Sequence, residues 1–136
     1  DWIPLKDDPM VAVLPPDHPY ADKKSYPIHA WEEETFIMPA LGQDYDTVQL
    51  LQEAKISPKI GFSTMDNRSA ISMIECGLGI SIMNELITKG MITQAVRIPV
   101  DPPRHITMSI ALPSIKKASP AACKFIGYLQ KMIPNS

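Results

Sequence analysis

The side chains that could carry out catalysis or hold a metal ion are scattered along this chain of 136 residues. Its histidines are His18, His29 and His105. No two of them have the spacing of a metal-ligand pair. The serines at positions 63, 69 and 81 are not part of a nucleophile-elbow pattern. We therefore expect no catalytic residue, no metal site, no cofactor and no enzymatic activity.

The two cysteines, Cys76 and Cys123, lie on expected helices and do not suggest a disulfide framework. This pattern favours a reducing compartment. Cys76 immediately precedes a glycine at a helix end, and we expect its thiol to be buried rather than reactive.

Composition excludes several classes of protein. The net charge is −2 and the chain has no basic block, which argues against nucleic-acid binding by these residues. The run of three glutamates at 32–34 has the character of a solvated helix face. No apolar run approaches the ~20 residues of a membrane span, so we expect no membrane contact.

The elements that must position any site are short, because the 14 prolines fall mostly between apolar runs. The segments expected to form strands are 10–14, 35–38, 59–63, 79–83, 95–100 and 106–112. The segments expected to form helical turns or helices are 28–33, 44–54, 66–76, 84–89 and 119–129. Caps are predicted at Asp44 or Asp46, at Asp66, and at Ser119 followed by Pro120.

Strands and helices alternate from residue 36 to residue 100, which predicts a parallel sheet covered by helices. In such sheets, ligands bind outside the carboxyl ends of the strands. Gly77 is expected to end a helix in the left-handed conformation. Gly79 is expected to let the next strand lie close under that helix.

Several segments stand in a familiar order. They are MVAVLPPDHPYA (10–21), FIMPA after EEET, MIECGLGISIM (73–83), DPPRHI before the last strand, and SPAACKFIGYL (119–129). Together they resemble the effector-binding domain of LysR-type transcriptional regulators over nearly the whole chain. The resemblance implies an α/β fold, a lobe like that of type II periplasmic binding proteins, with a parallel-rich sheet and helices on both faces, plus a partial second lobe. It also implies a small-molecule effector in the cleft between lobes.

The resemblance further implies how the chain divides. Residues 1–29 would be a remnant of lobe I and a crossover strand, residues 30–106 would be lobe II, and residues 107–136 the return strand and C-terminal helix of lobe I. DNA would be bound only through a winged helix-turn-helix that these residues lack. The complete protein would be a cytoplasmic dimer or tetramer. Two positions depart from the family pattern: Asn84 replaces a usual proline, and Lys55 replaces a usual glycine after a helix.

The candidate ligand site lies at the carboxyl edge of the sheet, in turns at 39–43, 63–67 and 83–84. The candidate ligand-binding residues are Pro39, Ala40, Gly42, Thr64, Met65, Asn67 and Asn84. The turn at 63–67 precedes a helix, whose free amides and dipole favour an anion. The alternative is that Thr64 or Asp66 merely caps the helix and that 39–43 is a simple loop.

The main functional hypothesis is therefore effector sensing, for a small and anionic metabolite, in a LysR-type regulator. The alternative is a periplasmic-type solute-binding protein that serves transport. A lobe of an enzyme, such as an aminotransferase-like or dehydratase lobe, is a more distant third hypothesis.

The absence of the first strands of lobe I should expose apolar surface on the strand at 10–14 and on the helix at 119–129. Exposed apolar patches drive association. We expect a dimer or larger species by light scattering, or disorder at both ends. A monomer with ordered termini would contradict this expectation.

Overall fold

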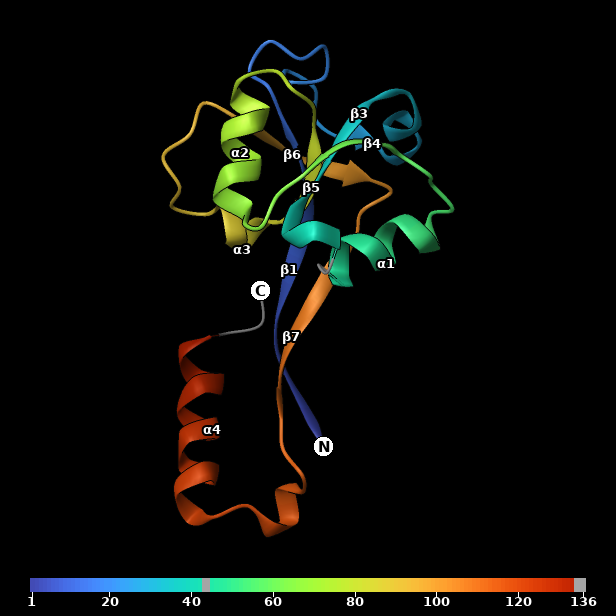
Figure 1. The fold of residues 1–136 in the computed structure, drawn as a ribbon. Coiled ribbons are helices and arrows are strands. Elements are labelled where there is room, and N and C mark those ends of the chain that lie inside the picture. The colour runs from blue at the N-terminus through green and yellow to red at the C-terminus, as the bar shows by residue number, and fades with distance from the viewer. Residues whose placement is uncertain (43–44, 134–136) are drawn as a thin grey trace. The chain divides into compact units, whose positions relative to one another are not determined.

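The computed structural model describes residues 1–42 and 45–133, which form two compact units (Figure 1). The larger unit is Pro9–Arg104, and the smaller joins Asp1–Asp8 to the chain from His105 onward. Gln43, expected in a turn, and Asp44, a candidate helix cap, lie outside the described residues. The lobe boundaries expected at residues 29 and 106 stay a prediction.

The larger unit is built on a mixed sheet. Its strands are β1 (Trp2–Leu14, which begins in the smaller unit), β2 (Tyr26–Pro27), β3 (Thr35–Met38), β4 (Lys59–Ser63), β5 (Ser81–Asn84) and β6 (Val96–Asp101). Hydrogen bonding gives the order β2-β6-β1-β5, and β3 pairs with β4. The Ile37 amide donates to the Ile80 carbonyl at 2.9 Å, which places β3 beside the start of β5.

All strands of this sheet except β1 run in one direction. β3 is parallel to β4, β2 is parallel to β6, and β5 and β6 are both antiparallel to β1. The predicted parallel-rich sheet is confirmed. The insertion of residues 10–14 between β5 and β6 was not predicted, because the alternation from residue 36 onward says nothing about where an earlier strand pairs.

Helices cover both faces of this sheet, as expected. The helical segments are η1 (Ile28–Glu33), η2 (Pro39–Gly42), α1 (Tyr45–Glu53), α2 (Asn67–Glu75) and α3 (Glu85–Thr88). Ala70, Ile71 and Ile74 of α2 pack in one core cluster with Val11 of β1 and Met83 of β5. Figure 1 shows α1 on the opposite side of the sheet from α2 and α3. Alternate side chains of each buried strand therefore meet different helices.

A polar contact secures the loop after β1. The Tyr20 amide donates to His18 Nδ1 at 3.1 Å, so Nε2 carries the proton and donates to Glu34 at 2.8 Å. The Tyr26 hydroxyl donates to the same carboxylate at 3.4 Å. Burial, together with the negative charge of Glu34, raises the pKa of Tyr26 above its ordinary range. The expectation that residues 32–34 are simply a solvated face is wrong for Glu34.

The end of α2 follows the predicted glycine pattern. Gly77 has φ of 76°, and its amide donates to the Ile74 carbonyl at 2.9 Å. The role expected for Gly79 is wrong, because a Cβ there would lie 2.6 Å from the Thr35 carbonyl oxygen. Gly79 therefore permits close approach to β3, not to α2.

Both cysteines are exposed, so the expected burial of the Cys76 thiol is wrong. Ile74 is the last buried residue of α2. Two residues later the helix has turned by roughly 200°, so Cys76 faces away from the core.

The smaller unit contains the first part of β1, β7 (His105–Ala111), η3 (Ile115–Lys117) and α4 (Pro120–Met132). β7 pairs with β1, and the Asp1 ammonium donates to the Leu112 carbonyl at 2.9 Å. Ser119 caps α4 by accepting from the Ala122 amide at 3.2 Å, as predicted. No residue of α4 is buried.

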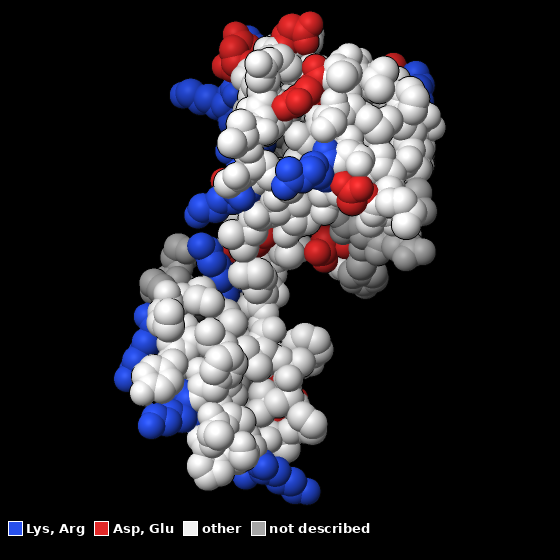
Figure 2. All heavy atoms as spheres, turned by 60° about the vertical axis from the view of Figure 1, so that its left-hand side comes forward, with Lys and Arg blue, Asp and Glu red and all other residues white. Residues whose placement is uncertain are grey.

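The expected exposure of apolar surface is thus confirmed for α4, where Phe125 and Tyr128 are exposed. It is wrong for residues 10–14, each at most 4% exposed, because β5 and β6 flank them. On the face shown in Figure 2, acidic and basic side chains are interspersed over the larger unit.

Lys55 adopts the strained conformation that its position implied. It has φ of 56°, and the next residue, Ile56, donates to the Leu51 carbonyl at 2.9 Å, closing a Schellman motif after α1. Lys55→Gly should raise the free energy of unfolding by about 0.5–1 kcal/mol, measured by urea denaturation, since glycine tolerates positive φ.

The matched control is Lys89→Gly, at the end of α3, where φ is −65°. Glycine removes no strain there and makes the unfolded chain more flexible, so this variant should not gain stability. Equal stabilisation by both substitutions would contradict the strain at Lys55.

Candidate functional site

The carboxyl ends of β3, β4 and β5 lie at one edge of the sheet, because these strands are neighbours and run in one direction. Each leads into one of the expected turns. The Thr64 amide donates to the Met38 carbonyl at 3.1 Å, so the turn after β4 begins beside the turn after β3. The structure therefore brings together residues 39–42 and 64–67.

Thr64 is committed to the structure of its own turn. It is 8% exposed, and its hydroxyl donates to the Asp66 carbonyl at 2.7 Å. The hydroxyl oxygen can still accept a hydrogen bond from a ligand. Met65, by contrast, projects outward, with 76% of its surface exposed.

Asp66 caps α2, as the alternative interpretation of this turn predicted. Its carboxylate accepts from the Ser69 amide at 2.8 Å and from the Ser69 hydroxyl at 2.9 Å. These hydrogen bonds lower the pKa of Asp66 below its usual range. A negative charge thus already occupies part of the helix N-terminus, and an anion would have to bind at the amides of Met65 and Asn67.

Asn67 provides an acceptor without a donor. Its Oδ1 is buried, and no donor reaches it within the residues that the structure describes. An unpaired buried polar atom of this kind costs about 1–3 kcal/mol unless water or a ligand satisfies it. Asn67 is therefore the candidate residue whose surroundings most clearly lack a partner.

The turn after β3 contains a strained residue. Pro39 is buried, and Ala40 has φ of 49°, a conformation that favours glycine. The sequence predicts that the glycine-containing turn lets a ligand approach the backbone, and the left-handed residue of this turn is Ala40. Such strain clusters at functional sites.

The N-terminal part of α1 reaches the same edge, which the sequence did not indicate. The buried Thr47 hydroxyl donates to the Ile82 carbonyl of β5 at 3.2 Å. No local pattern in the sequence marks this strand partner of Thr47.

Asn84 ends β5 at this edge and pairs with Met10 of β1. It is the N-cap residue of α3, but its side chain does not cap the helix. Because Asn84 stands where the family pattern has a proline, one end of the candidate site carries a polar amide group and not an apolar ring.

Residues 1–42 and 45–133 show neither a metal-binding cluster nor a membrane-spanning helix. They contain no group of three His, Cys, Asp or Glu side chains placed to hold a metal ion. None of their helices combines the length and apolar character needed to cross a membrane.

The model of the family described as "LysR substrate binding domain" matches residues 1–133. This chain belongs to the LysR substrate-binding domain family. The resemblance drawn from the sequence is thereby confirmed. This LysR domain is the effector-sensing part of such regulators, and the part that binds DNA is separate from it.

Relatives agree with the assignment. The chain is 31% identical over 128 residues to the uncharacterized HTH-type transcriptional regulator YvbU of Bacillus subtilis (strain 168), covering 93% of this chain and 44% of YvbU. It therefore spans less than half the length of that relative.

Solved structures share the fold of this LysR domain. The regulatory domain of Synechocystis PCC6803 CcmR superposes with a TM-score of 0.76 at 22% identity, covering 100% of this chain and 69% of CcmR. The effector binding domain of QuiR superposes with a TM-score of 0.73 at 20% identity, covering 98% and 65%. The expected type II periplasmic-binding-protein-like fold is confirmed.

The cap of α2 can be tested by titration. The Asp66 carboxyl should titrate below its usual range by carbon-detected NMR, and Ser69→Ala should raise its pKa by removing the hydroxyl donor. Because the pKa is lower in the folded than in the unfolded chain, this carboxylate stabilises the fold above the unfolded pKa. That contribution should be lost as the pH falls through the lowered pKa. A carboxyl that titrates in its usual range would contradict the cap.

Proposed function

We propose that this LysR domain senses a small metabolite that carries a carboxylate and a hydroxyl or N–H donor. The observation that carries the proposal is Asn67 Oδ1, which lies in the first turn of α2 and has no hydrogen-bond donor among residues 1–42 and 45–133. An effector donor would satisfy that oxygen, so that binding removes a cost of the empty state.

The carboxylate would bind to backbone amides of the same turn. Asp66 already accepts from the Ser69 amide, and the amides of Met65 and Asn67 stand at the start of the helix, where partial positive charge gathers. Charge-assisted hydrogen bonds from such amides are roughly twice as strong as neutral ones. Repulsion by Asp66 would direct the carboxylate to the Met65 side of the turn.

The neighbouring turns would supply the rest of the site. Pro39, Ala40 and Gly42 would present backbone to the effector, and Asn84 its side-chain amide. Thr64 would accept a hydrogen bond while it holds the turn in shape. CcmR in complex with 2-PG and QuiR in complex with shikimate support small-molecule binding by this fold.

We further infer that the complete protein is a cytoplasmic regulator, not an enzyme, which binds DNA through a winged helix-turn-helix beyond these residues. YvbU, an HTH-type transcriptional regulator, supports this over the solute-binding alternative. The gene sequence upstream of these residues distinguishes a transcription regulator from a solute-binding protein, because a secretory leader there would contradict a role as regulator.

Self-association is proposed through exposed apolar surface. β4 pairs with β3 alone in the described sheet and exposes Ile60 and Phe62, 55% and 40% accessible. Unprotected sheet edges and apolar patches favour pairing with another chain. The complete protein is thus proposed to be a dimer or tetramer.

A thermal-shift screen of metabolites on the full-length protein tests the proposed effector class, because a ligand of the native state raises the melting temperature. Hydroxy-carboxylates should raise it more than the same carboxylates without the hydroxyl. A response limited to neutral or cationic compounds would overturn the assignment.

Asn67→Ala gives a sharper test. It should weaken binding of an effector found in that screen by roughly tenfold to a hundredfold, the equivalent of one lost hydrogen bond. It should not destabilise the empty domain, because the oxygen it removes has no partner in the part of the chain that the structure describes. Isothermal titration and urea denaturation measure the two effects.

Two threonines provide the controls. Thr64→Val should weaken both binding and folding, since its hydroxyl holds the turn, and Thr64→Ser should restore both. Thr88→Val removes the hydrogen bond from the hydroxyl to the Glu85 carbonyl at 2.9 Å and the one that the hydroxyl accepts from Arg97 at 3.2 Å, and should destabilise the fold without changing affinity. Unchanged affinity in Asn67→Ala would show that the effector binds elsewhere.

A further inference from the structure

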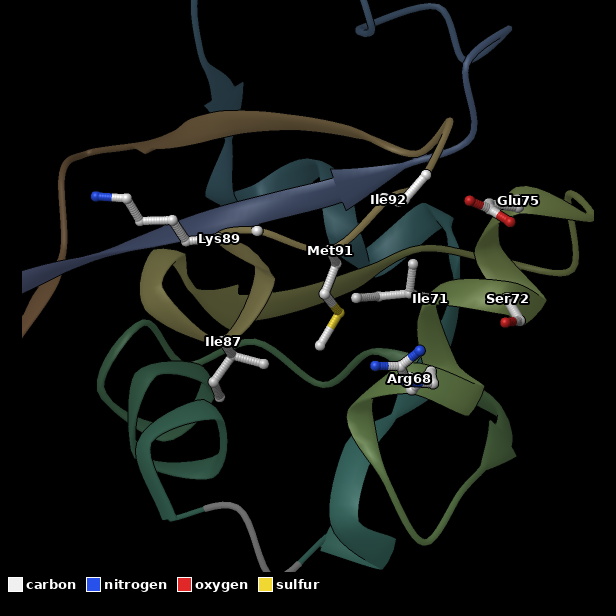
Figure 3. Close-up of a pocket in the computed structure, with 9 residues that line it drawn as sticks. Arg68, Ile71, Ser72, Glu75, Ile87, Lys89, Met91 and Ile92 are labelled. Carbon is white, nitrogen blue, oxygen red and sulfur yellow. The ribbon is translucent and has the colours of Figure 1, made fainter.

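A second concave surface lies along α2, on the side of the helix that faces the segment after α3. It is a groove of about 510 Å³ between this helix and the segment that joins α3 to β6. Arg68, Ile71 and Glu75 line it from α2, and Ile87, Lys89 and Met91 line it from the other side (Figure 3). Small-molecule sites have volumes of about 300–1,000 Å³, so the groove could hold a ligand of ordinary size.

The floor of this groove is apolar and well supported. Ile71 is buried in the core cluster, and Ile87 and Met91 are partly buried and pack against that cluster. In Figure 3 the side chains of Ile71, Ile87 and Met91 converge on the centre of the groove. They offer an apolar surface to any ligand that enters.

The wall opposite α2 is tied to the helix. The Glu75 carboxylate accepts from the Thr93 hydroxyl and from the Gln94 amide at 2.8 Å. These bonds lower the pKa of Glu75 below its usual value. These two hydrogen bonds hold residues 93–94 beside α2, so the two sides of the groove are tied together. They also give the carboxylate of Glu75, which lines the groove, two hydrogen-bond donors.

The basic side chains of the groove are less engaged. Neither Arg68 nor Lys89 forms an ion pair with any residue in the described part of the chain. Figure 3 shows the Arg68 guanidinium on the side of Met91, next to the apolar floor, whereas the Lys89 ammonium points away from the groove. Guanidinium groups bind carboxylates through paired hydrogen bonds.

We propose that this groove is a second ligand site of the domain, selective for small amphipathic carboxylates. The apolar body of the ligand lies on Ile71, Ile87 and Met91, and its carboxylate pairs with Arg68. None of the residues 64–67 lines this groove, and the proposal does not depend on the effector proposed at that turn.

The probe for this site is 3-phenylpropionate, and its matched control is 3-phenylpropanamide, which has the same shape without the charge. Titration of the chain is followed by NMR of the backbone amides and of the Ile and Met methyl groups. We expect saturable shifts at Ile71, Ile87 and Met91, with a Kd for the amide that is roughly tenfold higher or more.

Arg68→Gln should raise the Kd for 3-phenylpropionate roughly tenfold, while Lys59→Gln, an exposed site on β4, should leave it unchanged. Unchanged amide spectra in the absence of probe show that each variant keeps the fold. Equal binding of the two probes, equal effects of the two substitutions, no saturable shift, or shifts confined to residues 64–67 would each overturn the proposal.

Discussion

The larger unit depends on the pairing of residues 10–14 along both of their edges. This part of β1 forms antiparallel pairs with β5 on one side and with β6 on the other, and each of its residues is at most 4% exposed. Its backbone groups are satisfied in the ladders, while Val11 and Val13 supply one core face. Without this strand, β5 and β3 would have no connection through the sheet to β6 and β2.

The candidate site depends in turn on where β5 lies. The buried Ser81 hydroxyl donates to the Ile37 carbonyl of β3 at 2.8 Å, and Thr47 of α1 donates to the Ile82 carbonyl. Each of these bonds gives a buried hydroxyl a carbonyl partner, without which its burial would be costly. They also hold α1 and β3 against β5, so that several loops meet at one edge. Residues that never touch a ligand therefore decide the geometry of the site.

The edge itself carries features that work against stability. Ala40 has a left-handed backbone, and Asn67 Oδ1 is buried without a partner among the described residues. The Schellman turn after α1 adds a third cost at Lys55, but this residue lies away from the strand ends and has no proposed contact with a ligand. Strain and unpaired atoms at the edge are consistent with a surface shaped for binding, whereas the strain at Lys55 has no such role.

The sequence by itself determined the local elements and the family. Proline and glycine punctuation, the caps at Asp66 and Ser119, and the left-handed Gly77 depend on contacts within a few residues, so their patterns predict them directly. It also indicated which turns follow the parallel strands. Only the tertiary structure decided that β1 enters the middle of the sheet, that Glu34 bonds His18 and that Gly79 packs on β3. The groove along α2 belongs to this second group, since it is formed by residues about 20 positions apart. Each of these depends on pairing between distant segments, and the side-chain period of a strand shows which face is buried but not which strand lies beside it.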